Sequence, residues 1–229
     1  MLPRTRRTTD TPAETPAAVE PKRARTRAVA TASLIAATLA AGILTHLSAA
    51  DAAADPALYG FGSSSLLQSQ DFHDVGVKLD EQQVQLYGGQ ALSACTGEET
   101  MYDLAGKEVV NVGARWTSRT NADQLLTETA GRTASPAETT TLTRRLITKV
   151  KHCQHEPKGH WHYGGTRTLK AGSGSATWML SYDGDGIVSG GVAVIRDGNT
   201  FGILELTSPS GPAKKTVQQI VTEAIGRLE

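Results

Sequence analysis

The second half of the chain has a pattern of apolar and polar positions that predicts a helix followed by strands. Ser135, Pro136 and Glu138 form a helix start with a capping box. Apolar residues then recur at helical spacing on one face, namely Leu142, Leu146, Val150 and Cys153. Glycine-rich turns separate four further apolar segments, and we expect strands over residues 161–169, 175–182, 187–196 and 200–207. A last amphipathic helix is expected over residues 213–228.

The preceding segment carries weaker signals. Ser65 precedes a short helix expected over residues 66–75. For the polar stretch that follows, up to residue 89, we predict neither a helix nor a strand. Thr96 and Glu99 predict a capping box that opens a helical turn ending at Leu104. Residues 109–117 and 124–133 are expected to be two antiparallel strands. These elements predict an α+β fold, with an antiparallel sheet of about five to six strands and amphipathic helices packed on one side of it.

The N-terminal quarter differs from this pattern. Residues 1–27 are rich in arginine and proline, which predicts a disordered, basic cytoplasmic arm. Residues 28–47 form an uncharged apolar run, and about 20 such residues suffice to span a bilayer. Seven basic residues precede this run and none occurs in the 30 residues after it, so we expect the C-terminal part to lie outside the membrane. The resulting division is a membrane segment over residues 28–49, a linker over residues 50–64 and an extracytoplasmic domain over residues 65–229.

Two interpretations of the apolar run remain open. Its length and its long basic leader favour an uncleaved signal anchor, which would make the chain a single-pass protein of the cell membrane. Ala50, Asp51 and Ala52 form an A-x-A site, which favours a signal peptide and secretion after cleavage near Ala52. Both interpretations predict export.

The charge of the whole chain is balanced, with 23 basic and 23 acidic side chains, which argues against a nucleic-acid partner. Seven basic and three acidic residues lie in residues 1–50, so the rest holds 16 basic and 20 acidic residues and is mildly acidic. The chain has two cysteines. Because export places both in an oxidising compartment, we predict a disulfide between Cys95 and Cys153.

Four histidines within eleven residues form the sharpest compositional feature, in the segment HCQHEPKGHWH. Imidazoles bind zinc, copper or nickel, so one interpretation is a transition-metal site made by His152, His155, His160 and His162. A second interpretation is a pH response through protonation of the cluster. The third is a solvated loop after a helix, in which the histidines have no special role. The loop is favoured, and no cofactor is expected.

Motifs for catalysis are weak. Asp183 and Asp185 resemble the start of a calcium loop, but Ile187 follows where oxygen ligands are needed, so a hairpin turn is favoured. Nucleophile-elbow, phosphate-loop and dinucleotide motifs do not occur. We therefore expect a protein that is not an enzyme.

Four aromatic residues on the expected strands have two interpretations. Aromatic residues on strands usually pack in the core. They also line clefts for small molecules, and the candidates for such a cleft are Trp116, Trp161, Trp178 and Tyr182.

The order of segments resembles a known group. An LLQSQDF helix precedes GGQALSACTGEE, a strand with ARW, a Ser-Pro helix ending in cysteine, and a sheet followed by a last helix. Over about residues 60–228 this is similar to actinobacterial extracytoplasmic sensor-like domains, the group that includes the outer domain of mycobacterial serine/threonine protein kinase H. The resemblance implies a sheet with helices around a cleft for an unidentified ligand. This chain departs from the kinase-linked domains, because they typically have four cysteines and it has two. Its 229 residues also include no kinase domain.

These observations favour a non-enzymatic extracytoplasmic binding or sensor-like module, membrane-anchored through residues 28–47 or secreted. Its expected partner is a small ligand or a component of the cell envelope. The first alternative is an extracytoplasmic transition-metal-binding protein that uses the His152–His162 cluster. The second is a secreted hydrolase with no recognisable motif.

Overall fold

The computed structural model describes residues 61–85, 89–118, 124–208, 211–212 and 214–229. The predicted basic arm, the apolar run and most of the linker lie outside these residues. Within the described ranges, none of the helices has the length and apolar character needed to cross a bilayer.

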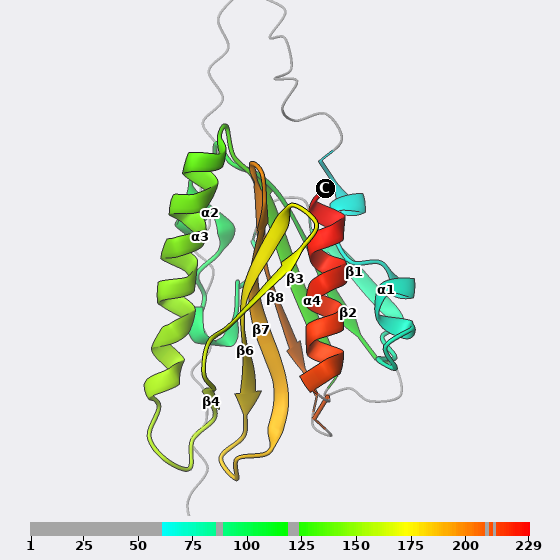
Figure 1. The fold of residues 1–229 in the computed structure, drawn as a ribbon, viewed down its shortest axis with the longest axis vertical. Coiled ribbons are helices and arrows are strands. Elements are labelled where there is room, and N and C mark those ends of the chain that lie inside the picture. The colour runs from blue at the N-terminus through cyan, green and yellow to red at the C-terminus, as the bar shows by residue number, and fades with distance from the viewer. Residues whose placement is uncertain (1–60, 86–88, 119–123, 209–210, 213) are drawn as a thin grey trace, which may run out of the picture. The chain divides into compact units, whose positions relative to one another are not determined.

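The described residues form one antiparallel sheet flanked by helices (Figure 1). Its strands run in the order β1-β2-β3-β8-β7-β6-β4, and β5 also pairs with β6. The strands are β1 (Glu81–Gln85), β2 (Val110–Thr117), β3 (Leu125–Arg132), β4 (His162–Tyr163), β5 (Arg167–Ala171), β6 (Gly174–Tyr182), β7 (Val188–Asp197) and β8 (Thr200–Thr207). The α+β class and the antiparallel sheet are thus confirmed.

The sheet has eight strands in the described residues, more than the predicted five to six. One added strand is β1, an edge strand in the polar stretch to which no element was assigned. Its residues 82–84 are exposed, so it lacks the alternation that marks a half-buried strand. The other addition arises because the predicted strand over residues 161–169 is two strands, β4 and β5, separated at Gly164 and Gly165.

The two long helices cover opposite faces of the sheet, α3 (Pro136–Val150) on one and α4 (Lys214–Leu228) on the other (Figure 1). Successive residues of β7 point to opposite faces. Ala193 and Ile195 pack with α4, whereas Val192 and Val194 pack with α3. The prediction that the helices pack on one side is therefore wrong. The continuous apolar run of β7 is typical of a strand that is buried on both faces.

The long helices begin and end close to their predicted positions. Ser135 Oγ accepts a hydrogen bond of 3.3 Å from the Glu138 N–H, and Pro136 occupies the first turn, as predicted. The second half of the predicted capping box differs, because the Glu138 carboxylate accepts from the Ala134 N–H at 3.2 Å and not from that of Ser135. After Val150 the chain continues in a 3-10 turn, η4 (Lys151–His155), which contains Cys153.

The short helices differ from the prediction because other residues cap them. Helix α1 (Ser69–His73) begins after Gln68, and Ser65 instead ends a 3-10 turn, η2 (Ser63–Ser65). Helix α2 (Met101–Ala105) has Thr100 as its cap. The predicted cap, Thr96, ends another 3-10 turn, η3 (Ala94–Thr96), whose own cap is Ser93.

The α4 face of the sheet buries an acidic side chain, Glu128 on β3, which is 1% exposed. The backbone N–H of Leu67 donates to its Oε2 at 2.7 Å, and its Oε1 has no hydrogen-bond partner among the described residues. Burial away from water raises the pKa of Glu128 to about 8. Nearby, the Arg227 guanidinium of α4 binds both carboxylate oxygens of Asp71 on α1, at 2.9 and 2.7 Å.

Candidate functional site

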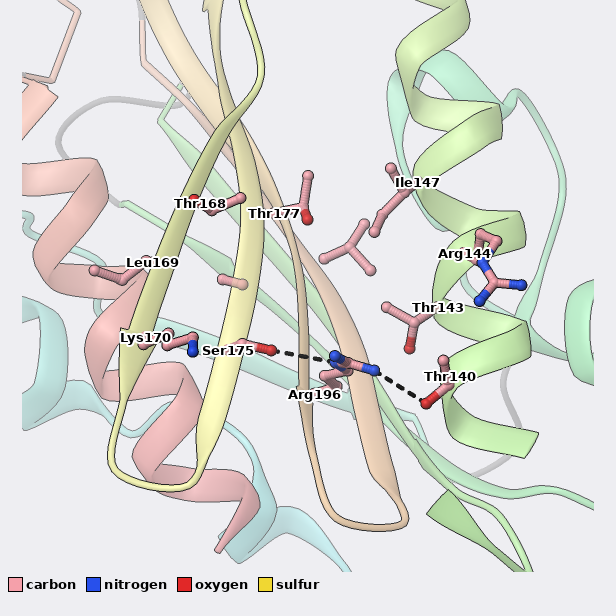
Figure 2. A pocket seen from close by; sticks show the side chains of 12 residues that line it. Thr140, Thr143, Arg144, Ile147, Thr168, Leu169, Lys170, Ser175, Thr177 and Arg196 are labelled. Carbon is pink, nitrogen blue, oxygen red and sulfur yellow. Dashed lines mark hydrogen bonds between the residues drawn. The ribbon is translucent and has the colours of Figure 1, made fainter. Parts of the chain in front are cut away.

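A groove of about 620 Å³ lies beside α3, on the face of the sheet that this helix covers only in part (Figure 2). Helix α3 contacts mainly β7 and β8, and the part of the face formed by β5 and β6 stays open. A volume of this size is typical of sites for small molecules. The lining residues are Thr140, Thr143, Arg144, Ile147, Thr168, Leu169, Lys170, Ser175, Ala176, Thr177, Val194 and Arg196.

The floor of the groove follows from strand alternation and register. Ser175 pairs with Lys170 on one side and with Arg196 on the other, so these three residues form one row across β5, β6 and β7. Thr177 forms the next row with Thr168 and Val194. The rows therefore place hydroxyl groups and cationic side chains on the same open face.

The wall of the groove is one stripe of α3, made by Thr140, Thr143, Arg144 and Ile147, whose spacing places them on one helix face. Thr140 Oγ1 donates to the carbonyl of Pro136 at 2.8 Å, which leaves its lone pairs free to accept. It accepts from Nη1 of Arg196 at 3.0 Å, and so links α3 with β7 across the groove.

Arg196 is the cation of the groove whose side chain is oriented by hydrogen bonds on two sides (Figure 2). Besides its bond to Thr140, it donates from Nε to Ser175 Oγ at 3.2 Å. Its Nη2 makes no hydrogen bond to any residue that the structure describes. The guanidinium is thus oriented by two neutral hydroxyls and keeps donors available for a ligand.

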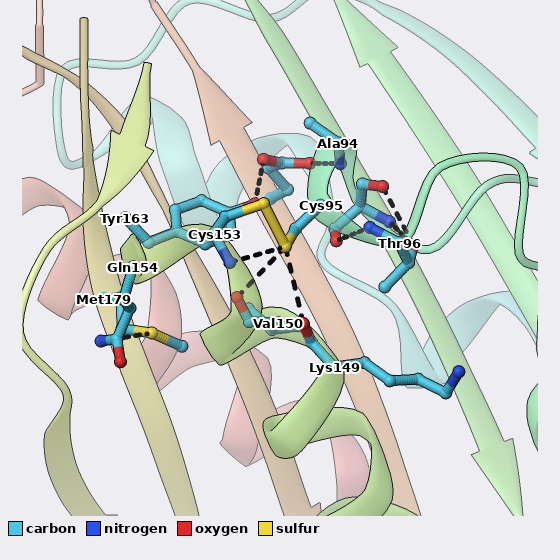
Figure 3. The surroundings of a disulfide bond; sticks show 11 residues. Ala94, Cys95, Thr96, Lys149, Val150, Cys153, Gln154, Tyr163 and Met179 are labelled. Carbon is cyan, nitrogen blue, oxygen red and sulfur yellow. Dashed lines mark hydrogen bonds between the residues drawn. A yellow bond between two sulfur atoms is a disulfide. The ribbon is translucent and has the colours of Figure 1, made fainter. Parts of the chain in front are cut away.

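The disulfide between Cys95 and Cys153 is present, as predicted, and its Cα atoms are 5.8 Å apart (Figure 3). It joins η3 to the 3-10 turn after α3, and the Cys153 N–H donates to Cys95 Sγ at 3.2 Å.

A second hollow, of about 350 Å³, lies next to this bond and includes Glu205 of β8 in its lining. Tyr163 Oη donates to Glu205 Oε1 at 2.5 Å, and the Ala94 N–H donates to Oε2 at 2.8 Å. Burial raises the pKa values of both Glu205 and Tyr163. Both carboxylate oxygens serve to hold β4, β8 and η3 together, so we assign this cluster a structural role.

The histidine cluster is dispersed over the surface after α3. His152, His155 and His160 are exposed, and His162 stacks on Tyr182 with 5.4 Å between ring centroids. Nδ1 of His162 hydrogen-bonds the carbonyl of His160 at 3.0 Å. Among the residues that the structure describes, no three histidine, cysteine, aspartate or glutamate side chains are grouped so that they could hold a metal ion.

The four aromatic residues proposed for a cleft do not meet. Trp116 and Trp178 are buried in the core on the α4 side, where Phe72 packs edge-on against Trp116. Trp161 packs against Tyr163 at the margin of the core on the α3 side. None of the four lines either of the two hollows described above.

The DGDG segment is the hairpin turn between β6 and β7 that its composition predicts. Asp183 Oδ1 accepts from the backbone N–H groups of Asp185 and Ile187, at 3.0 and 2.8 Å. This use of the carboxylate is typical of an Asx turn.

The fold is similar to a solved extracellular domain. No protein-family model matches the chain, and no curated protein matches it either. The crystal structure of the extracellular domain of PknH from Mycobacterium tuberculosis matches with a TM-score of 0.50 and 9% identity, over 72% of this chain and 93% of that chain. The likeness is one of fold. It confirms the predicted resemblance at that level.

Proposed function

We propose that this chain is an extracytoplasmic, sensor-like module that binds a ligand in the groove between α3 and strands β5–β7, and that it is not an enzyme. The groove carries the proposal, because it is open, has the volume of a small-molecule site and is lined by polar groups that converge from four elements. The fold shared with the extracellular domain of PknH supports the extracytoplasmic part.

The lining of the groove supports binding over hydrolysis. It offers hydroxyl groups on Thr140, Thr143, Thr168, Ser175 and Thr177, but no lining residue is a histidine, a carboxylate or a cysteine. The bases that most often activate a serine or threonine nucleophile are histidine and carboxylate side chains, and the lining has neither. The hydroxyls of this groove are therefore better suited to hydrogen bonding with a ligand.

We propose further that the domain lies outside the membrane, anchored through residues 28–47 or released after cleavage near Ala52. Protease added to intact cells is expected to remove a C-terminal epitope from an anchored protein, and the culture medium is expected to contain it if the protein is released. Immunoblots of the cell, membrane and medium fractions distinguish these results. An epitope found only in the cytosol, protected from protease, would contradict export.

Ligand binding predicts a thermal shift of the full chain with soluble envelope fragments, such as peptidoglycan fragments, envelope oligosaccharides and organic phosphates. A ligand at a hundred times its dissociation constant stabilises the folded state by about 2.7 kcal/mol, which raises the melting temperature by several degrees. Differential scanning fluorimetry measures this shift for each compound.

The matched variant is Thr177→Trp, which fills the groove from its floor. We expect it to fold, because Thr177 is partly exposed, and to lose the shift. A shift that persists in this variant would place the ligand elsewhere, and no shift with any compound of the panel would count against the proposed function.

A further inference from the structure

Three cationic side chains line the groove from three different elements: Arg144 from α3, Lys170 from β5 and Arg196 from β7. No carboxylate residue lines the groove with them. None of the three forms an ion pair with a residue that the structure describes. The groove therefore concentrates positive charge.

This concentration contrasts with the rest of the domain. Residues 51–229 hold 16 basic and 20 acidic side chains, so carboxylates are in excess. Cations elsewhere form ion pairs with these carboxylates. Lys149, on the same helix as Arg144, pairs with Glu99 at 2.9 Å, and Arg227 pairs with Asp71. Lys170 and Arg196 stand on either side of Ser175 in one row, so two positive charges share one face of the sheet without a counter-charge, and a bound anion offsets them.

The groove also offers donors with fixed directions. Ser175 and Thr140 hold the Arg196 guanidinium from two sides, which leaves Nη2 available. A guanidinium matches the oxygens of a phosphate or carboxylate in pairs, whereas an ammonium such as that of Lys170 acts as a compact charge. Beside these groups, Ile147 and Val194 add apolar surface to the lining.

We propose that the groove binds a small organic phosphate, whose phosphate group is held by Lys170 and Arg196 on either side of Ser175 and whose apolar part lies against Ile147 and Val194, while Arg144 adds positive charge from the wall. A phosphate monoester carries a charge of about −1.5 to −2 near neutral pH, which three cations balance better than they balance a single carboxylate. This assignment rests on the proposed function, because it names the ligand class of the same groove.

The test compares three probes on the full chain by isothermal titration calorimetry: phenyl phosphate, phenyl glucoside and inorganic phosphate. Phenyl phosphate is expected to bind most tightly, because it alone uses both the cations and the apolar surface. Its affinity is expected to fall as salt is raised, since exposed charges are screened. Two further probes, dihexanoyl phosphatidic acid and glycerol 3-phosphate, distinguish a lipid headgroup from a free phosphate as the natural ligand. Clearly tighter binding of the phosphatidic acid assigns a lipid headgroup, whereas equal binding of both probes assigns a free phosphate.

Variants locate the site. Arg196→Gln and Lys170→Gln are each expected to weaken phenyl phosphate binding about tenfold or more, as the loss of a hydrogen bond to a charged group predicts. The matched control is Arg145→Gln, an exposed neighbour of Arg144 that does not line the groove, and its affinity is expected to be unchanged. Melting curves of all variants check that each is folded.

Three results would overturn the phosphate assignment: no binding of phenyl phosphate, equal binding of phenyl glucoside, or equal losses in Arg145→Gln and Arg196→Gln. These failures are separable from failure of the proposed function. If a neutral compound binds and Thr177→Trp abolishes its binding, the groove is a ligand site and only the anionic class is wrong.

Discussion

Replacing Cys95 and Cys153 with serine is expected to lower the free energy of unfolding by about 4 kcal/mol, because the bond closes a loop of 58 residues and the chain entropy of the unfolded state rises when it is lost. Cys153 lies against the core on the α3 side, so the variant also loses packing there. Urea denaturation of the double variant, compared with the oxidised protein, measures the change.

The reduced wild-type protein is the matched control, since it keeps both sulfur atoms and lacks only the bond. We expect it to be destabilised nearly as much as the double serine variant. A loss below about 1 kcal/mol in both proteins would be far from the chain-entropy value. It would mean that η3 and the end of α3 are held together by their other contacts alone, such as the Lys149–Glu99 ion pair.

A second large effect is expected from Glu128, whose buried carboxyl group makes the folded protein prefer the protonated form. Its pKa is about 8 when folded and about 4.5 when exposed to water. Below pH 4.5 both states are protonated and the group costs no stability. As the pH rises from 4.5 to 8 the unfolded state ionises first, so we expect stability to fall by up to about 1.4 kcal/mol per pH unit.

Glu128→Gln is expected to remove this fall, because the amide keeps the shape of the side chain and can still accept the Leu67 N–H. The variant should be more stable than the wild type at pH 8 and similar to it at pH 4. Glu223→Gln, on the exposed side of α4, is the control and should keep the slope of the wild type. Urea denaturation at several pH values provides the comparison, and identical slopes in the wild type and Glu128→Gln would refute the assignment.

The elements with strong local signals were predictable from the sequence. Helix α3 follows from its Ser-Pro start and its apolar stripe, and β8 (Thr200–Thr207) was predicted with the observed limits because a hairpin turn and β-branched and aromatic residues mark it. Strand β1 was missed because an edge strand with exposed residues has no apolar period. The placement of α3 and α4 on opposite faces depends on which apolar residues of β7 meet which helix, and that is decided by tertiary packing.

The candidate site was harder to predict for the same reason. The sequence draws attention to the histidine run and the tryptophans, which are local features. The groove instead depends on strand register, which brings Arg196 into one row with Lys170 and Ser175 although it follows Ser175 by 21 residues. A signal was present, because Thr168 and Lys170 in β5 and Ser175 and Thr177 in β6 alternate with Leu169 and Ala176. Only the pairing of these strands with β7, beside α3, makes the pattern a site.

The ion pair between Arg227 and Asp71 has a consequence for how the fold tolerates rearrangement. It joins helices from opposite ends of the described chain, and the C-terminus lies beside η2 (Figure 1). Neighbouring ends are what circular permutation requires. A short linker from residue 229 to residue 61, with new ends at the exposed turn of Asp185 and Gly186, would keep every strand of the sheet intact. We therefore expect the groove to form even when the elements follow one another in a different order along the chain.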